Sequence, residues 1–293
     1  MTSSSLVLDR VRARIVVDSS SNVPAALLAQ YNMLEVPTLV NFGTESLRNN
    51  IDLTAEQFYE RFAQSQALPT TSQPPPQFFA AAYQRAFDEG AEHIVVVTVS
   101  AKFSGTFSSA QSAAQAFGLE RFTLWDSDTA TMASGWQAIA AARLIEATLD
   151  LPTLLDHLEK IRTNTIGYAT LETLKYVARS GRVSNLQAGI GDLLQVKPVM
   201  ELHYGTFSPV GRVRGKKRAL REIVERLYAK FERRPTNIAV AHSNAMEEAL
   251  ALAQDARSLL NIQELHIVDI GPVIATLTGP GGLAICGYPT DLF

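Results

Sequence analysis

The stretch His93-Ile94-Val95-Val96-Val97-Thr98-Val99-Ser100-Ala101-Lys102-Phe103-Ser104-Gly105-Thr106 decides the fold of this chain. Its first half is apolar with no polar alternation, which is typical of a parallel strand covered by helices on both faces. Its second half is polar and reaches a serine and a glycine, which predict the start of a helix that ends near Phe117. Strand, polar loop and helix in this order form one unit of a doubly wound parallel sheet.

Similar units lie on both sides of this stretch. Arg14–Val17 and Phe122–Trp125 are predicted strands, and each is followed by a polar loop and a helix. Leu34–Phe42 is predicted to be a further strand, and the prolines of Leu68–Pro76 predict a rigid loop, because proline cannot donate to a ladder. We therefore expect α/β structure, with residues 1–163 forming an N-terminal Rossmann-like domain of three layers, α/β/α, around a parallel sheet.

The second half of the chain has a different pattern. Lys197–His203 and Thr206–Val210 predict an antiparallel pair around Tyr204-Gly205, and Lys216–Phe231 predicts a basic amphipathic helix. Further strands and helices follow up to Leu283–Gly287. Residues 164–293 are accordingly expected to form a C-terminal α/β domain with a mixed sheet.

Composition excludes several classes of function. The chain has 293 residues and a net charge of −3, and this mild acidity argues against nucleic acid as the main partner. Cys286 is the only cysteine, so no intrachain disulfide forms. The five histidines share no metal-ligand spacing, and no phosphate-binding loop or nucleophile elbow is present, so neither a metal nor a cofactor is expected. The start of the chain is not a signal peptide and no apolar run in the sequence approaches the roughly 20 residues that span a bilayer, so the protein is expected to be cytoplasmic.

Polar loops after the predicted strands mark a candidate binding site. In an open α/β sheet, ligands bind at the edge where the carboxyl ends of the strands meet. Ser104-Gly105 at a helix start leaves backbone N–H groups that can hold an anion. The alternative is that Ser104 only caps its helix, and Ser180-Gly181-Arg182 is open to a similar interpretation as a helix stop with a solvated arginine.

Together these segments resemble the DegV family, the bacterial fatty-acid-binding proteins. The order and spacing of several short motifs carry the resemblance, which spans nearly the whole chain. The motifs are Val17-Asp18-Ser19, Thr71-Ser72-Gln73-Pro74, Phe103-Ser104-Gly105-Thr106, Ser180-Gly181-Arg182-Val183, Lys197-Pro198 and Thr278-Gly279-Pro280-Gly281.

The resemblance implies two α/β domains with a long-chain fatty acid between them, its alkyl chain in an apolar tunnel. Family members act as the lipid-presenting subunit of a fatty acid kinase, in which a separate ATP-dependent enzyme makes an acyl phosphate for phospholipid synthesis. The chain itself is then non-catalytic and has the fatty acid as its ligand. The resemblance implies that Thr71 and Ser104 hydrogen-bond the carboxylate. The other implied ligand-binding residues are Gly105, Thr278 and Gly279. Arg182 is implied to engage the kinase near the mouth of the tunnel.

One position departs from the family pattern. The family usually has histidine immediately before Thr-Gly-Pro-Gly, and here that position is Leu277. Leucine cannot donate a hydrogen bond, so a lipid or small-molecule sensor without a kinase partner stays an alternative. A hydrolase or transferase that uses Ser104 as its nucleophile is the other alternative, but it needs a base beside Ser104, and Leu277 removes the most plausible one. Membrane contact through Lys216–Phe231 is expected to be transient at most. Local sequence does not determine the length, saturation or branching of the acyl chain. Nor does it determine the oligomeric state or the identity of the kinase.

Overall fold

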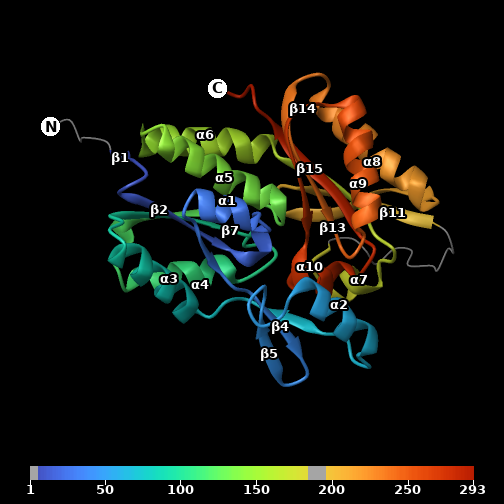
Figure 1. The fold of residues 1–293 in the computed structure, drawn as a ribbon, viewed down its shortest axis with the longest axis horizontal. Helices are drawn as coiled ribbons and strands as arrows, with labels where there is room; N and C mark the ends of the chain where they lie inside the picture. The colour runs from blue at the N-terminus through green and yellow to red at the C-terminus, as the bar shows by residue number, and fades with distance from the viewer. Residues whose placement is uncertain (1–5, 184–195) are drawn as a thin grey trace.

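A computed structural model describes residues 6–183 and 196–293. Its first sheet has four parallel strands in the order β3-β2-β7-β8 (Figure 1). These strands are β2 (Ala13–Asp18), β3 (Leu34–Val36), β7 (His93–Thr98) and β8 (Phe122–Asp126). The order reverses between β2 and β7, so the loops after these two strands meet at a topological switch point.

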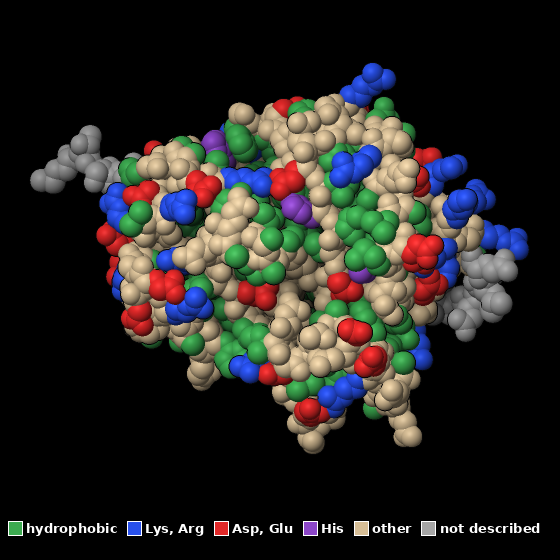
Figure 2. Space-filling model, in the orientation of Figure 1, with side chains coloured by type: hydrophobic (Ala, Val, Ile, Leu, Met, Phe, Trp, Pro, Cys, Tyr) green, Lys and Arg blue, Asp and Glu red, His purple; other side chains and the backbone are tan. Residues whose placement is uncertain are grey.

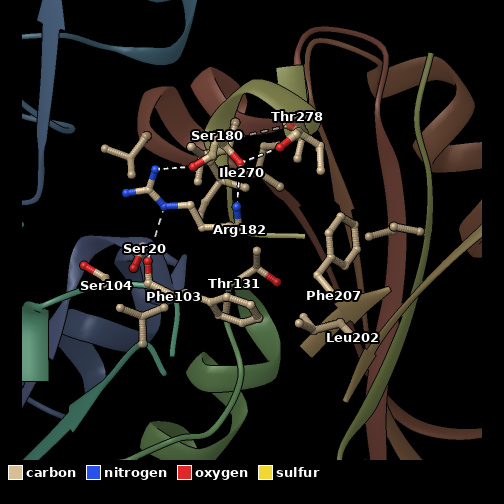
Figure 3. Close-up of a pocket in the computed structure, with 18 of the residues that line it drawn as sticks. Ser20, Phe103, Ser104, Thr131, Ser180, Arg182, Leu202, Phe207, Ile270 and Thr278 are labelled. Carbon is tan, nitrogen blue, oxygen red and sulfur yellow. Dashed lines mark hydrogen bonds between the residues drawn. The ribbon is translucent and has the colours of Figure 1, made fainter. Parts of the chain in front are cut away.

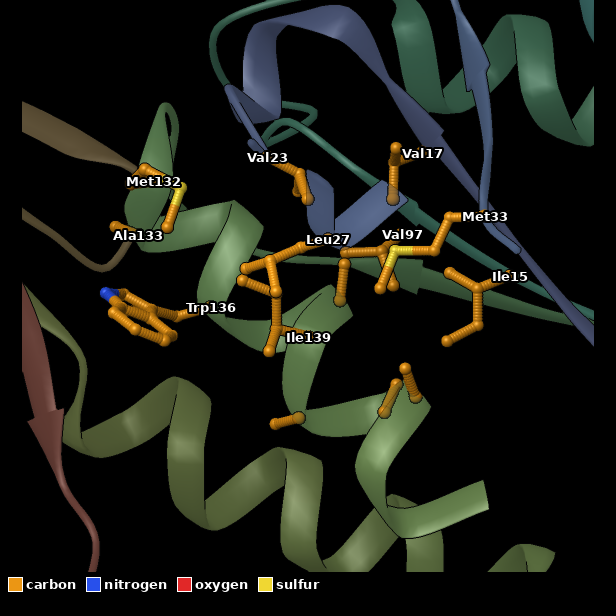
Figure 4. Packing of buried hydrophobic residues seen from close by; sticks show 14 of the residues in the cluster. Ile15, Val17, Val23, Leu27, Met33, Val97, Met132, Ala133, Trp136 and Ile139 are labelled. Carbon is orange, nitrogen blue, oxygen red and sulfur yellow. The ribbon is translucent and has the colours of Figure 1, made fainter. Parts of the chain in front are cut away.

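Helices cover both faces of this sheet, which explains the unbroken apolar strands. Val95 and Val97 of β7 pack in one core cluster with Trp136 and Ile139 of α5 (Met132–Glu146) (Figure 4). The residues that alternate with them, Ile94 and Val96, pack in another cluster with residues of two further helices. These are α3 (Pro76–Asp88) and α4 (Thr106–Gln115). The predicted three-layer α/β/α arrangement is therefore confirmed.

The second sheet has six strands in the order β12-β11-β10-β15-β13-β14 and is mixed, as predicted. Only β13 and β14 run parallel; the other neighbours are antiparallel. The strands are β10 (Ile166–Thr170), β11 (Val196–His203), β12 (Thr206–Arg214), β13 (Pro235–His242), β14 (Asn261–Asp269) and β15 (Leu283–Pro289). Helices α8 (Lys216–Phe231) and α9 (Met246–Leu259) cover its outer face (Figure 1).

The turn of the β11–β12 hairpin is the predicted one. His203 pairs with Thr206, and the two residues between them both have positive φ, 46° at Tyr204 and 64° at Gly205. Two such residues form the tight turn that matches the twist of antiparallel strands.

Two segments of the first half differ from the prediction. Leu34–Phe42 is not one strand, because Pro37 separates β3 from β4 (Leu39–Phe42). Strand β4 leaves the parallel sheet and joins a three-stranded antiparallel sheet with β5 (Glu45–Arg48) and β6 (Thr70–Ser72). The prediction of a rigid loop over Leu68–Pro76 is therefore wrong for its centre, since β6 pairs with β4 between Pro69 and the three consecutive prolines.

The small sheet lies beside two helices below the main sheets (Figure 1). Helix α2 (Ala55–Gln64) begins at the predicted capping box of Thr54 and Gln57. Helix α10 (Gly271–Thr278) was not predicted, although Pro272 in its first turn is a usual start signal. The remaining elements are α1 (Ala25–Gln30), α6 (Leu151–Asn164), α7 (Lys175–Ser180), two 3-10 turns (Ser19–Ser21 and Leu119–Arg121), and the paired strands β1 (Val7–Leu8) and β9 (Leu149–Asp150).

The two large sheets share one core. Residues of β13 and β15, such as Ala241 and Cys286, belong to the same cluster as Trp136 and Val97. The chain passes from α6 into the second sheet at Thr165. The division into domains at residues 163 and 164 stays a prediction.

Candidate functional site

A cavity of about 500 Å³ lies between the two large sheets. Its walls come from loops at the carboxyl edge of the parallel sheet, from β6, from β10, β11, β12 and β15, and from α7 and α10. The volume falls in the range of about 300–1,000 Å³ that is usual for small-molecule sites. Loops after all four parallel strands contribute, as the predicted position of the site requires.

One end of the cavity is polar and is built at the switch point. Asp18, at the end of β2, accepts hydrogen bonds from the backbone N–H of Val99 at 2.7 Å and of Ser20 at 3.0 Å. The Ser20 hydroxyl also donates to the Asp18 carboxylate. These bonds join the loops after β2 and β7, and both Ser20 and Val99 line the cavity. The hydroxyls and amides at this end belong to Ser20, Thr38, Thr71, Ser72, Gln73, Ser104 and Thr106.

The other part of the cavity is apolar. Its floor is made of small side chains, because Ala169 of β10, Ala284 of β15 and Ala241 of β13 lie next to one another in register. Leu202 and Phe207 of the β11–β12 hairpin lie across from Ser104 and Ser20 in Figure 3. Further apolar walls are Leu171, Val177, Val273, Ile274, Leu277 and Leu283. The cavity therefore suits an amphiphile with a long apolar part.

Three of the predicted ligand-binding residues lie together at the polar end. Thr71 is on β6, and Ser104 and Gly105 are at the start of α4. The Ser104 hydroxyl accepts from the backbone N–H of Thr106 at 3.3 Å and lies 2.8 Å from the Thr106 hydroxyl. Ser104 thus makes local bonds at the helix start while it also faces the cavity.

Gly105 allows a close approach. A Cβ atom there would lie 2.3 Å from Oε1 of Gln73, so only glycine lets this carboxamide pack against the helix start.

The other three predicted residues lie elsewhere around the cavity. Thr278 lines it, but its hydroxyl donates back to the carbonyl oxygen of Ile274 at 3.1 Å, within α10. Gly279 is not among the lining residues; it ends α10 with φ 75°, and a Cβ atom there would lie 2.2 Å from the Tyr176 ring. Gly279 thus packs against Tyr176 of α7, and its place in the binding set stays a prediction.

Arg182 lies at the rim. Its side chain is exposed, Nη1 donates to the carbonyl oxygen of Ser180 at 2.5 Å and Nε donates to that of Phe103 at 3.4 Å (Figure 3). Ser180 belongs to the second half of the chain and Phe103 belongs to the first half. The guanidinium therefore connects the two halves at the opening of the cavity. Arg182 is the only Lys, Arg, Asp, Glu or His among the described lining residues.

Burial sets the ionisation of two groups at the cavity. It raises the pKa of Asp18, although the hydrogen bonds from Ser20 and Val99 act in the opposite direction. Burial also raises the pKa of the Cys286 thiol to about 12, so the thiol stays protonated at neutral pH. In the described part of the chain, no group of three or more potential ligands is placed to hold a metal ion.

Some cavity residues carry little local signal in the sequence. Thr38 falls inside the strand predicted over Leu34–Phe42, and only Pro37 before it signals the break. Phe207 and Leu202 lie on the predicted hairpin, but they reach the cavity through the pairing of β11 with β10, which no local pattern predicts. Leu277 lines the cavity with an apolar side chain, at the position where the family resemblance leads one to expect a donor.

The basic helix α8 uses its apolar face within the protein. Ala219, Ile223, Val224, Leu227 and Phe231 are buried against the second sheet, which leaves its charged face outside. Lys and Arg side chains accordingly gather at the right-hand edge in Figure 2, where α8 lies. No helix within residues 6–183 and 196–293 combines the length and apolarity that crossing a membrane requires.

A family model and two relatives match this chain over nearly its full length, and all three belong to the same family. The family model described as uncharacterised protein, DegV family, matches residues 12–290. A DegV domain-containing protein of Deinococcus radiodurans is 33% identical over 276 residues, which cover 94% of this chain and 98% of the relative. Protein DegV of Bacillus subtilis is 31% identical over 274 residues, with 93% and 97% covered.

Two solved structures extend the comparison to the fold. A DegV family protein from Thermus thermophilus, described as binding fatty acid, superimposes with a TM-score of 0.88 at 33% identity, covering 95% of this chain and 99% of that chain. DegV from Bacillus subtilis, described as a fatty acid binding protein, gives a TM-score of 0.84 at 30% identity, with 96% and 100% covered.

Proposed function

The chain belongs to the DegV family, and from that premise we propose that it binds a long-chain fatty acid in the cavity between its two sheets. The single observation that carries the proposal is the cavity itself, polar at the switch point and apolar over the alanine floor. The proposal assigns the protein a binding role rather than a catalytic one, with the fatty acid as its ligand.

The apolar part of the cavity supplies most of the affinity. An acyl chain of about 16 carbons has about 14 methylenes, and at about 0.8 kcal/mol each their burial contributes up to roughly 11 kcal/mol before ordering costs. One charge-assisted hydrogen bond contributes about 1.5–3 kcal/mol. Binding therefore tolerates the apolar Leu277, while the polar end sets the orientation of the ligand.

The head group is assigned to the polar end. Thr71 and Ser104 face the cavity from β6 and from the start of α4, and Gly105 lets the Gln73 carboxamide pack beside them. The N-terminus of α4, which has ten residues, adds a favourable dipole for a carboxylate.

The test begins with mass spectrometry of the small molecules released from the purified, denatured protein. A stoichiometric long-chain fatty acid is the expected result, and the absence of any amphiphile together with no binding of added palmitate would refute the proposal. The variant Thr71→Ala with Ser104→Ala is then expected to lower palmitate affinity by about 10-fold or more, because two hydrogen bonds are lost. Unchanged affinity would show that the head group lies elsewhere.

The finer proposal is that the protein presents the carboxylate to a separate ATP-dependent kinase in the cytoplasm, for acyl phosphate formation and phospholipid synthesis. Arg182 supports it, because an exposed guanidinium at the rim offers donors to a partner or to a phosphate. We expect Arg182→Ala to retain palmitate affinity and to lower acyl phosphate formation with the cognate kinase. The matched control is Arg179→Ala, an exposed arginine of α7 that does not line the cavity.

Equal losses of lipid binding and phosphorylation in Arg182→Ala would show that this arginine serves the cavity rather than the partner. If the protein binds a fatty acid that no kinase from the same cell phosphorylates, it would instead be a lipid sensor. Transient membrane contact is compatible with either role, since the charged face of α8 remains outside.

A further inference from the structure

We infer that Thr38 donates a hydrogen bond from its hydroxyl into the cavity and is a further head-group residue. The inference rests on the proposed function, because it adds a residue to the same site. Thr38 lies between β3 and β4, lines the cavity and is only 4% exposed. Its hydroxyl is therefore buried at the polar end.

The direction of the hydrogen bonds around Ser19 determines where the Thr38 proton points. The Ser19 hydroxyl oxygen accepts from the backbone N–H of Thr38 at 3.0 Å and from Nδ2 of Asn49 at 3.0 Å. A hydroxyl oxygen has two lone pairs and one proton. Since the two N–H groups occupy both lone pairs, the Ser19 proton goes to the Thr38 hydroxyl oxygen, which is 2.8 Å away.

The orientation of the Asn49 amide supports this assignment. Its Oδ1 accepts from the backbone N–H of Val273 at 3.4 Å, which leaves Nδ2 to face Ser19. An amide turned the other way would place an oxygen against the Ser19 oxygen and the amide NH₂ against a backbone donor. Val273 belongs to α10, so a helix from the second half of the chain holds this arrangement in place.

The chain of donors then ends at the cavity. Asn49 donates to Ser19, and Ser19 donates to Thr38. Ser19 and Asn49 are 0% and 1% exposed, so bulk water does not compete for these bonds. The Thr38 proton is left for a group inside the cavity, and a ligand oxygen is the acceptor that satisfies it.

Strand register places Thr38 next to the predicted carboxylate ligands. Val40 of β4 pairs with Thr71 of β6 in an antiparallel ladder. Thr38 lies two residues before Val40, and side chains two residues apart along an extended chain share a face. Diagonal neighbours in such a ladder are about 7–8 Å apart, which allows one ligand oxygen to lie between the hydroxyls of Thr38 and Thr71. Thr38 thereby supplies a donor that Leu277 cannot.

The experiment compares palmitate binding by the unaltered protein and by Thr38→Val, which keeps the shape of the side chain and removes the hydroxyl. We expect an affinity loss of about 10- to 100-fold, the value of one hydrogen bond to a charged group. With palmitate labelled with ¹³C at its carboxyl carbon, we also expect the infrared carboxylate band of the bound ligand to shift between the two proteins.

Two further variants make the result specific. Thr38→Ser keeps the donor and is expected to bind within about threefold of the unaltered protein. Thr276→Val is the matched control, because its hydroxyl donates to the carbonyl oxygen of Pro272 within α10 and it does not line the cavity.

The outcomes separate this inference from the proposal on which it rests. Palmitate binding that survives Thr38→Val with an unshifted carboxylate band would overturn the role of Thr38 alone. An equal loss in Thr276→Val, or a failure of Thr38→Ser to restore binding, would also overturn it. No palmitate binding by the unaltered protein would overturn the proposed function and the inference together.

Discussion

The ammonium nitrogen of Lys102 lies 2.8 Å from the backbone carbonyl oxygen of Tyr204. Lys102 follows β7 of the parallel sheet, and Tyr204 is at the tip of the β11–β12 hairpin of the mixed sheet. The same ammonium also donates to Asp128 at 2.9 Å. The hairpin whose Leu202 and Phe207 line the cavity is thus held against the loops that follow β7 and β8.

The tip of this hairpin leaves no room for a side chain at residue 205. A Cβ atom on Gly205, which has φ 64°, would lie 2.4 Å from Oδ1 of Asp128 and 2.5 Å from Cδ of Lys102. We expect Gly205→Ala to lower the free energy of unfolding by about 2–4 kcal/mol, since it adds a steric clash to the backbone strain. Urea unfolding measures the change.

Gly43→Ala is the control for Gly205, because Gly43 has φ 61° and nothing within 4 Å of an added Cβ. It is expected to cost only about 1 kcal/mol, from backbone strain alone. Equal costs for the two substitutions would mean that the hairpin tip is not tightly packed.

The alanine floor predicts how the affinity of the cavity depends on the length of the fatty acid. Ala284→Phe places a ring above β15, between Ala169 and Ala241, and removes space for the alkyl chain. We expect palmitate affinity to fall by about 100-fold or more, because several methylenes lose their buried positions at about 0.8 kcal/mol each. Isothermal titration with fatty acids of decreasing length measures the effect. The affinity loss caused by Ala284→Phe is expected to be smaller for short fatty acids, whereas an equal loss at every length would show that the alkyl chain lies elsewhere.

Leu277 is expected to be the position that weakens carboxylate recognition. Leu277→His adds a side chain that donates and, with an ordinary imidazole pKa near about 6.5, carries a charge at low pH. Palmitate affinity is then expected to rise by about tenfold at pH 6, with a smaller gain at pH 8. Leu277→Gln is the neutral comparison, and a gain of equal size at both pH values in the histidine variant would argue against a charge effect.

A half-buried glutamate predicts how stability depends on pH. Burial raises the pKa of Glu35 on β3 to about 7, a hydrogen bond from Asn50 opposes the shift and the nearby Asp18 adds to it. In the unfolded chain the pKa lies near the ordinary 4.5. Between these values the folded state holds a proton that the unfolded state has lost, so stability falls as the pH rises from about 4.5 to about 7.

Glu35→Gln removes this dependence. We expect the variant to be more stable than the unaltered protein by roughly 1–3 kcal/mol at pH 8, with the difference vanishing below about pH 4.5. Urea unfolding at several pH values measures it, with the exposed Glu92→Gln as the control. A difference independent of pH would contradict the titration of Glu35.

Local sequence predicted those parts of the fold that local physics decides. The apolar run of β7 requires cover on both faces, and packing of its alternate residues into two clusters confirms that reading. The capping box at Thr54 and the turn at Tyr204-Gly205 depend only on residues a few positions apart. Family motifs named Thr71, Ser104 and Gly105, and these residues do lie together at the cavity.

Tertiary structure decided what depends on partners far apart in the chain. Gly279 stands inside a family motif, and only the fold shows that the Tyr176 ring leaves no space for a side chain at this end of α10. The floor of Ala169, Ala241 and Ala284 exists because three strands pair in one register, and each alanine alone carries no such signal. Thr38 points its proton into the cavity because Ser19, Asn49 and Val273 fix the direction of each bond. Sequence by itself thus determined the fold class and the family, whereas packing between distant segments determined the shape of the cavity and the direction of its donors.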